Sequence, residues 1–335
     1  MGGTWNKGIK IGLLFFCWFV MEVALCFAQS APARIIMDGS QTLYPLSRVV
    51  AQNFEKVKPE VKLVLNFSGS GPGFKKLCAG EIDVCNASRP IKALESELCA
   101  KQEVSYIELP VAYDAVVVVV NVRNEWADEI SIAELKKIWE PAAQGQLTRW
   151  NQIRSDWPLR PLRLYGPAVE SGTYDYFTAA ILGLEGTSRG DFSSGTDLLS
   201  VVEGVSSDIN ALGFLPLSFC FSNQEKLKAL PLVEGGGVVF PSVQAVRGGA
   251  YRLLSRPLFL YVSAKAARRP AVSSFVEYYL SNAGSLAADN GYVALEQAGY
   301  NVALKRFRAG ISGTLFRDRE AGVGLSMDDL LKIQG

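Results

Sequence analysis

The sequence predicts an α/β protein, and three features of the chain favour this class. Residues 38–45, 68–75 and 166–173 each follow an apolar strand pattern, are rich in hydroxyl groups or glycine, and lead into a helical pattern. Residues 115–121 contain an unbroken valine run, which is typical of a strand buried on both faces of a sheet. A chain of 335 residues is also long enough for two domains.

The composition narrows the range of functions. Hydrophobic residues make up 49% of the chain and charged residues 20%, as in ordinary globular proteins. Beyond residues 1–30 the positive and negative charges balance, so no bulk attraction to nucleic acid is expected. Histidine is absent, which excludes Ser-His-Asp and Cys-His catalysis and histidine-based metal sites. No S-x-x-K spacing pairs a serine nucleophile with a lysine base.

Residues 1–30 are predicted to be a cleaved secretory signal. Lys7 and Lys10 precede the apolar residues 11–21, and small residues follow between Ala28 and Ala31, where cleavage is expected. The protein is therefore expected to be exported.

Two alternatives compete with a cleaved signal. An uncleaved membrane anchor is less favoured, because Glu22 interrupts an apolar stretch already shorter than the roughly 20 residues that span a bilayer. A lipid anchor on Cys26 is also less favoured, because the residue before a lipidated cysteine is normally small and here it is Leu25.

Residues 68–75 are predicted to bind an anion, with Ser70 as the candidate ligand-binding residue. Glycine lets the backbone approach a ligand closely, and the N–H groups at the start of a helix have no partner within that helix. Phosphate suits such a site. The alternative is a plain loop, since clusters of glycine and serine often form turns only.

Residues 38–45 repeat this pattern after a short strand at residues 35–37. The hydroxyl of Thr42 and the amide of Leu43 are predicted to face one point at the start of the next helix. The alternative is a helix cap by Ser40 or Thr42, which needs no ligand.

Ser88 and Arg89 follow a predicted strand at residues 82–87 that stops before Pro90. Ligands of open α/β sheets lie at the carboxyl ends of the strands. Arg89 is therefore a candidate to bind an oxyanion through its planar guanidinium, with a solvated surface arginine as the alternative.

Six stretches occur in order between Ile35 and Phe316: GSQTLYPLS, SGSGPGFKKLCAGEIDVCNASRPI, LPVAYDAVVVVVN, KKIWEPAAQGQLTRWNQ, YGPAVESGTYDYFT and SRPLFLYVS. Together they resemble successive signatures of the phosphate-binding protein of phosphate ABC transporters. The resemblance implies a periplasmic binding protein of the type II fold, with two α/β lobes and inorganic phosphate in the cleft between them. It also implies a periplasmic monomer without cofactor, whose partner is the membrane permease of a phosphate ABC transporter.

This resemblance divides the chain into a signal at 1–30, a first lobe at 31–112 and 258–316, a second lobe at 113–257 and a tail at 317–335. The chain is expected to cross between the lobes near residues 111–116 and to return in a strand at 256–262. Strands are predicted at residues 106–110 and 115–121, and helices at 198–213, 272–280 and 284–297. Beyond Phe316 the tail is polar and uninformative.

Residues 166–173 lead into a predicted helix of the opposite lobe. The Ser171-Gly172-Thr173 unit resembles the main phosphate clamp of the family, with two hydroxyls and an amide at one helix start. A helix cap alone uses only one of these hydroxyls.

The sequence departs from the family pattern at two positions. Ser88 stands where the better-known branch of the family has the aspartate that accepts the phosphate proton, and Pro167 stands where it has an arginine. Arg89 is the candidate to replace the lost arginine. Three carboxylates are open candidates for the proton acceptor: Glu170, Asp175 and Asp38.

The resemblance also implies a disulfide between Cys78 and Cys99, which suits an oxidising compartment. Cys85 and Cys220 are predicted to be buried thiols. No spacing of cysteines suggests a metal site.

Three functions follow from these observations. The first is capture of phosphate by hinge closure and delivery to a permease. The second keeps the fold but binds sulfate, molybdate or tungstate, and it is favoured if the site has no carboxylate. The third is a secreted hydrolase of phosphate esters, which has little support because no general base or metal cluster is evident, so no enzymatic activity is expected.

Overall fold

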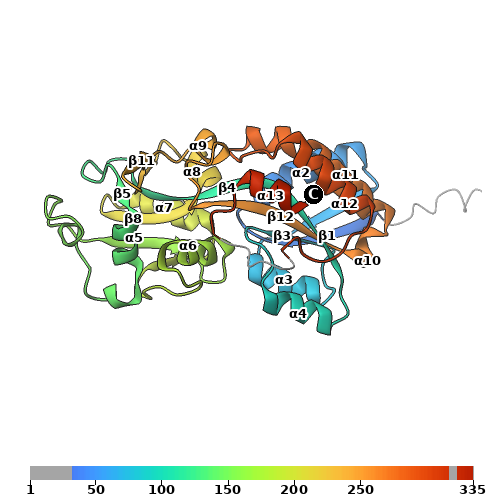
Figure 1. The fold of residues 1–335 in the computed structure, drawn as a ribbon, viewed down its shortest axis with the longest axis horizontal. Coiled ribbons are helices and arrows are strands. Elements are labelled where there is room, and N and C mark those ends of the chain that lie inside the picture. The colour runs from blue at the N-terminus through green and yellow to red at the C-terminus, as the bar shows by residue number, and fades with distance from the viewer. Residues whose placement is uncertain (1–31, 317–322, 335) are drawn as a thin grey trace, which may run out of the picture. The chain divides into compact units, whose positions relative to one another are not determined.

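Two long strands pair at the centre of the fold, and one of them continues into both halves. The computed structural model describes residues 32–316 and 323–334, and within them β4 (Tyr106–Asn121) and β12 (Ser255–Ser263) lie side by side (Figure 1). All 16 residues of β4 are buried, as the valine run predicts for a strand covered on both faces. The prediction of two separate strands here is wrong, because residues 112–115 still pair with β12 and carry the strand onward.

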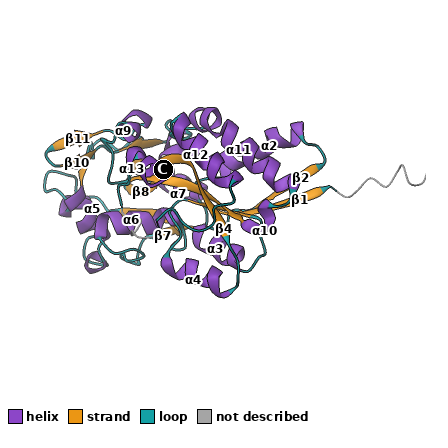
Figure 2. Cartoon of the chain, turned by 45° about the vertical axis from the view of Figure 1, so that its right-hand side comes forward, coloured by secondary structure: helices purple, strands orange, loops and turns teal. Residues whose placement is uncertain are grey.

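Lobe 1 has a five-stranded sheet in which β1 and β3 are parallel and β12 is antiparallel to β3 and β4. Its strand order is β2 (Val61–Leu65), β1 (Ala33–Gly39), β3 (Val84–Ala87), β12 and β4. Helices cover both faces of this sheet (Figures 1 and 2). One face carries α2 (Tyr44–Val57), α11 (Pro270–Asp289) and α12 (Gln297–Arg308), and the other carries α3 (Ser70–Cys78) and α4 (Ala93–Lys101).

Lobe 2 continues the same sheet from the far end of β4. The strand order is β4, β8 (Ala211–Pro216), β6 (Arg163–Pro167) and β7 (Ser193–Gly195), and β9 (Leu227–Ala229) pairs with the end of β4. The helices of this lobe are α5 (Ile132–Trp139), α6 (Gly172–Leu182), α7 (Leu198–Ser207), α8 (Leu217–Phe221) and α9 (Val243–Arg247). A small sheet of β11 (Gly237–Val239), β10 (Leu232–Glu234) and β5 (Ile130–Ser131) completes it.

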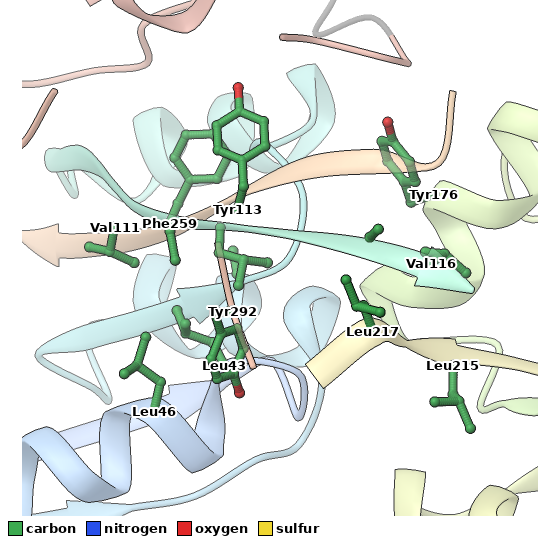
Figure 3. Packing of buried hydrophobic residues seen from close by; sticks show 14 of the residues in the cluster. Leu43, Leu46, Val111, Tyr113, Val116, Tyr176, Leu215, Leu217, Phe259 and Tyr292 are labelled. Carbon is green, nitrogen blue, oxygen red and sulfur yellow. The ribbon is translucent and has the colours of Figure 1, made fainter. Parts of the chain in front are cut away.

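The two lobes meet within strands rather than at loops. Along β4 the partner changes from β12 to β8 between Ala115, which pairs with Ser255, and Val116, which pairs with Pro216. Figure 3 shows buried side chains along this junction, with Val111 and Tyr113 before the change of partner and Val116 after it. The predicted two-lobed α/β fold is confirmed. One connection is the continuous, buried strand β4, and the other enters β12, which begins at Ser255 beside the change of partner.

The C-terminal region differs from its prediction. Helix α11 runs through Gly284 to Asp289, and α12 begins only at Gln297, so the predicted helix at 284–297 is wrong. Gly291 has a φ of +76° in the turn that separates the two helices. The predicted helix at 198–213 is also too long, since α7 ends at Ser207.

The tail, for which the sequence predicted no element, contributes to the fold. It contains α13 (Met327–Gln334), which packs on α12, and Leu330 is 2% exposed. The Tyr113 hydroxyl of β4 donates to the carbonyl of Ser326, and the amide of Gly324 donates to the Tyr176 hydroxyl of α6. The tail therefore contacts an element of lobe 2 as well as lobe 1.

The disulfide between Cys78 and Cys99 is present and joins α3 to α4. Closing a loop of this length stabilises a protein by about 3 kcal/mol in the chain-entropy account. Cys85 and Cys220 are buried free thiols, as predicted.

Candidate functional site

Hydroxyl groups from both lobes meet at one buried point. The Oγ1 atoms of Thr42 and Thr173 lie 3.1 Å apart, and the Oγ atoms of Ser70 and Ser88 lie 3.3 Å apart. All four residues are at most 1% exposed. A Cβ on Gly172 would lie 2.5 Å from Ser88 Oγ and 2.7 Å from Ser70 Oγ, so only glycine allows this approach of α6 to lobe 1.

The first turn is shaped by Gly39. Its φ is +131°, and a Cβ there would lie 2.1 Å from the carbonyl oxygen of Asn86, so the chain leaving β1 lies tightly against the end of β3 beside it. Helix α2 then begins after Leu43 without any side-chain cap. The alternative prediction of a cap by Ser40 or Thr42 is therefore wrong, and the Thr42 hydroxyl faces Thr173 instead.

The starts of α3 and α6 differ in their capping. Helix α3 begins after Gly69, with a φ of +110° and no side-chain cap. Helix α6 begins after Ser171, whose hydroxyl accepts the amide hydrogen of Thr173 at 3.0 Å. The positive dipole ends of α2, α3 and α6 thus lie near the buried hydroxyls.

Arg256 of β12 is a site residue that the sequence analysis missed. It is 0% exposed, and its Nη1 donates to the carbonyl of Gly172 at 2.9 Å. Its Nη2 donates to the hydroxyls of Thr173 at 2.9 Å and Thr42 at 3.3 Å. The sequence feature that could have revealed it is the arginine at the start of the apolar stretch SRPLFLYVS, where a charged residue is unusual.

Asp114 of β4 lies directly across the ladder from Arg256 and is also 0% exposed. Its Oδ2 is 3.5 Å from Arg256 Nη2, and its Oδ1 accepts the amide hydrogen of Ser218 at 3.3 Å. Burial raises the pKa of Asp114, and the Arg256 charge opposes this rise. Burial lowers the pKa of Arg256, and Asp114 opposes this fall.

Arg89 lies at the end of β3, as predicted, but two carboxylates hold it. Its Nη1 and Nη2 donate to Glu95 at 2.8 and 2.7 Å, and its Nε donates to Asp175 of α6 at 2.9 Å. Burial lowers the pKa of Arg89, but Glu95 and Asp175 outweigh burial and raise it above its usual value. Lys92 also contacts Asp175 at 3.1 Å and Glu185 at 2.8 Å, so an ionic cluster links the two lobes.

Asp38 and Glu170, the other two carboxylates predicted to accept the phosphate proton, do not face the buried hydroxyls as free acceptors. Asp38 accepts the amide hydrogens of Gly39 at 2.7 Å and Ser68 at 2.8 Å, and it pairs with Lys76. Burial raises the pKa of Asp38, but the bonds from Lys76 and these amides outweigh it and lower the pKa. The side chain of Glu170 is exposed, and only its backbone carbonyl lies near Gly69.

Two cavities open between the lobes. One, of about 370 Å³, is lined by Gln41 and Tyr44 of lobe 1 and by Leu198 of lobe 2, among others. The other, of about 1020 Å³, is lined by Arg89 and Asp175 among others. Among the described residues no group of three or more cysteine, aspartate and glutamate side chains is placed to hold a metal ion. No helix in the described ranges is long and apolar enough to cross a membrane.

The fold and the buried hydroxyls between its lobes define a two-lobed binding protein of the type II class. A family model of the PBP superfamily domain matches residues 28–283. Protein SphX of Synechococcus elongatus is 46% identical over 309 residues, which cover 92% of this chain and 91% of the relative. Phosphate-binding protein PstS of Staphylococcus aureus is 30% identical over 274 residues, 81% of each chain.

A solved structure agrees with these relatives. The crystal structure of a possible phosphate binding protein from Planctomyces limnophilus is 36% identical and has a TM-score of 0.63, and it covers 84% of this chain and 100% of that one. The chain therefore belongs to the PBP superfamily and, within it, to the phosphate-binding proteins that include PstS, which confirms the family predicted from its sequence motifs.

Proposed function

We propose that this protein captures inorganic phosphate between its two lobes and delivers it to the membrane permease of an ABC transporter. The observation that carries the proposal is the meeting of hydroxyls and helix N-termini from both lobes at one buried point. Such groups donate hydrogen bonds to oxyanions, and helix dipoles favour negative charge. An anion that bonds to both lobes stabilises the closed form over the open one.

Each turn has a role in this proposal. Residues of lobe 1 donate from the Thr42 hydroxyl, the Leu43 amide and the hydroxyls of Ser70 and Ser88. Residues of lobe 2 donate from the Ser171-Gly172-Thr173 clamp. The hydrogen bond between Thr42 and Thr173 is exchanged for bonds from each hydroxyl to the anion, so little binding energy is lost in opening it.

The proposal includes an exported, monomeric protein that works in the periplasm without enzymatic activity, cofactor or nucleic acid. The predicted signal at residues 1–30 lies outside the described residues. The relative named PstS is a phosphate-binding protein, and this name supports a binding role over a hydrolytic one.

A second oxyanion is the alternative ligand, and a specific observation favours it. Of the three carboxylates predicted to accept a phosphate proton, Asp38 and Asp175 are held by cations and Glu170 is exposed. A site without an acceptor suits sulfate, molybdate or tungstate, which have no proton to donate.

Calorimetric titration of the protein without residues 1–30 tests the proposal. Phosphate, sulfate and molybdate are titrated separately, and phosphate is expected to bind most tightly with a stoichiometry of one. Preference for sulfate or molybdate would support the alternative ligand. No binding of any oxyanion would refute both.

A further inference from the structure

The hydroxyls of the proposed phosphate site surround a buried charged pair on the two strands that connect the lobes. Arg256 of β12 and Asp114 of β4 are cross-strand partners, and both are 0% exposed. The guanidinium contacts groups from both lobes, since it donates to Thr42 of lobe 1 and to Gly172 and Thr173 of lobe 2.

We propose that Arg256 is the cation of the phosphate site and that Asp114 accepts the proton of monohydrogen phosphate. The inference rests on the proposed function and deepens it, because it assigns the charge and the selectivity of that site. The pair would replace the arginine and the aspartate that are missing at Pro167 and Ser88.

Arg256 is only loosely paired for a buried guanidinium. Its Nε is buried and has no hydrogen-bond partner among the described residues, and its one carboxylate neighbour is 3.5 Å away. Arg189 is also buried, at 3% exposed, but its guanidinium is closely paired. It pairs with Asp191 at 2.8 Å and also donates to the carbonyls of Ile138 and Leu147. An anion beside Arg256 would supply a closer negative charge than Asp114 does.

Arg256 also orients the hydroxyls around it. A hydroxyl has one hydrogen and two acceptor positions, and Nη2 of Arg256 occupies an acceptor position of both Thr42 and Thr173. Each threonine hydrogen is therefore directed away from the guanidinium. One of them is shared between the two hydroxyls at 3.1 Å and turns to the anion when that bond opens. Arg256 thus prepares both hydroxyls as donors before the ligand arrives.

Asp114 has unused capacity to accept a hydrogen bond. The amide of Ala115 also bonds to it, and its contacts from Ser218 and Arg256 are long at 3.3 and 3.5 Å. Glu108, the other fully buried carboxylate of β4, is bonded by Tyr261 at 2.7 Å, Leu315 at 2.8 Å and Thr314 at 2.9 Å. The proton of monohydrogen phosphate can therefore be donated to Asp114, whereas sulfate has no such proton and would be repelled.

The test compares Kd values for phosphate and sulfate in the parent protein and four variants, with the thermal unfolding midpoint measured for each. Arg256→Gln is expected to weaken binding of phosphate at least about 100-fold, and Arg256→Lys about 10-fold, because lysine keeps the charge but loses the planar fork. Asp114→Asn is expected to lower the phosphate-to-sulfate preference at least about 10-fold. Glu108→Gln is the matched control and should leave that preference unchanged.

A further measurement needs no variant. Monofluorophosphate has the double charge of monohydrogen phosphate but no O–H, so the parent protein should reject it as it rejects sulfate. The role of Asp114 would be overturned if the parent protein bound phosphate and monofluorophosphate equally well. It would also be overturned if the Asp114→Asn variant kept the parent's preference for phosphate over sulfate.

An Arg256→Gln variant that binds phosphate within about threefold of the parent would overturn the role of Arg256. If Arg256→Gln fails to fold, binding of phosphate by Arg256→Lys within about threefold of the parent would overturn this role instead. Failure of the parent protein to bind phosphate would instead refute the proposed function, so the two failures are distinguishable.

Discussion

Thr42 and Thr173 are 131 positions apart in the sequence, yet their hydroxyl oxygens are 3.1 Å apart between the lobes. One hydroxyl comes from the start of α2 and the other from the start of α6. The contact brings together two turns of similar chemistry, and Arg256 donates to both hydroxyls. This relationship leads to the first of four predictions.

Removing the hydroxyls of the clamp should weaken phosphate binding. Ser171→Ala and Thr173→Ala each leave an anion oxygen without a donor, so each should cost on the order of 1.5–3 kcal/mol of binding free energy. The measurement is calorimetric titration with phosphate. Ser131→Ala is the control, because Ser131 caps α5 in the way that Ser171 caps α6. If the Ser171→Ala, Thr173→Ala double variant binds phosphate as tightly as the parent protein, these residues are not part of the phosphate site.

Phosphate should make the protein more compact. The proposed closure brings together turns that belong to different lobes, while β4 connects the lobes as a continuous strand. Small-angle scattering with and without phosphate should show a smaller radius of gyration in the bound form. Sulfate at the same concentration is the control for ionic effects. Identical scattering curves with saturating phosphate would indicate that the lobes are already closed without ligand.

The ionic cluster between the lobes should favour the closed form. Arg89 and Lys92 of lobe 1 contact Asp175 of lobe 2 at 2.9 and 3.1 Å. Asp175→Asn should therefore weaken binding of phosphate and sulfate by the same factor, about 3- to 30-fold, and make affinity less sensitive to salt. The measurement is Kd at two salt concentrations.

Glu277→Gln is the control for this experiment, because Glu277 pairs with Arg308 at 2.7 Å within lobe 1 alone. A change in the phosphate-to-sulfate preference of Asp175→Asn would show instead that Asp175 accepts the ligand proton. That result would also contradict the role proposed for Asp114.

Glu134 should stabilise the protein at neutral pH but not in strong acid. Burial raises the pKa of Glu134, but bonds from Arg154 and Ser131 outweigh it and lower the pKa from 4.5 to about 2. A lowered pKa in the folded state gives stability that is complete above 4.5 and is lost as pH falls toward about 2.

Glu134→Gln should therefore reduce the free energy of unfolding by about 1–2 kcal/mol at neutral pH, a value discounted because solvent reaches the pair. Urea titrations from neutral pH down to strong acid measure this difference, which should shrink as the pH falls. Glu125→Gln is the control, because Glu125 is exposed and has no partner among the described ion pairs. A difference that is constant with pH would point to the cap of α5 rather than to the charge.

Local patterns of the sequence predicted the parts of the site that lie in turns. Glycine and hydroxyl residues mark a turn before a helix, so the stretches around Thr42, Ser70 and Ser171 could be recognised without coordinates. The order of six motifs predicted the family and the two-lobed fold. The buried valine strand was recognisable for the same reason, since it depends on neighbouring residues.

The tertiary structure decided which charges reach the site. Arg89 occupies the predicted strand end, but Glu95 and Asp175 fill its hydrogen-bonding edges. Arg256 lies in an apolar strand and reaches the hydroxyls because β12 pairs with β4 beside α6. Charge is a property of one residue, whereas its partners and burial depend on contacts between distant segments. The sequence could therefore predict where an anion would be held but not which arginine would hold it.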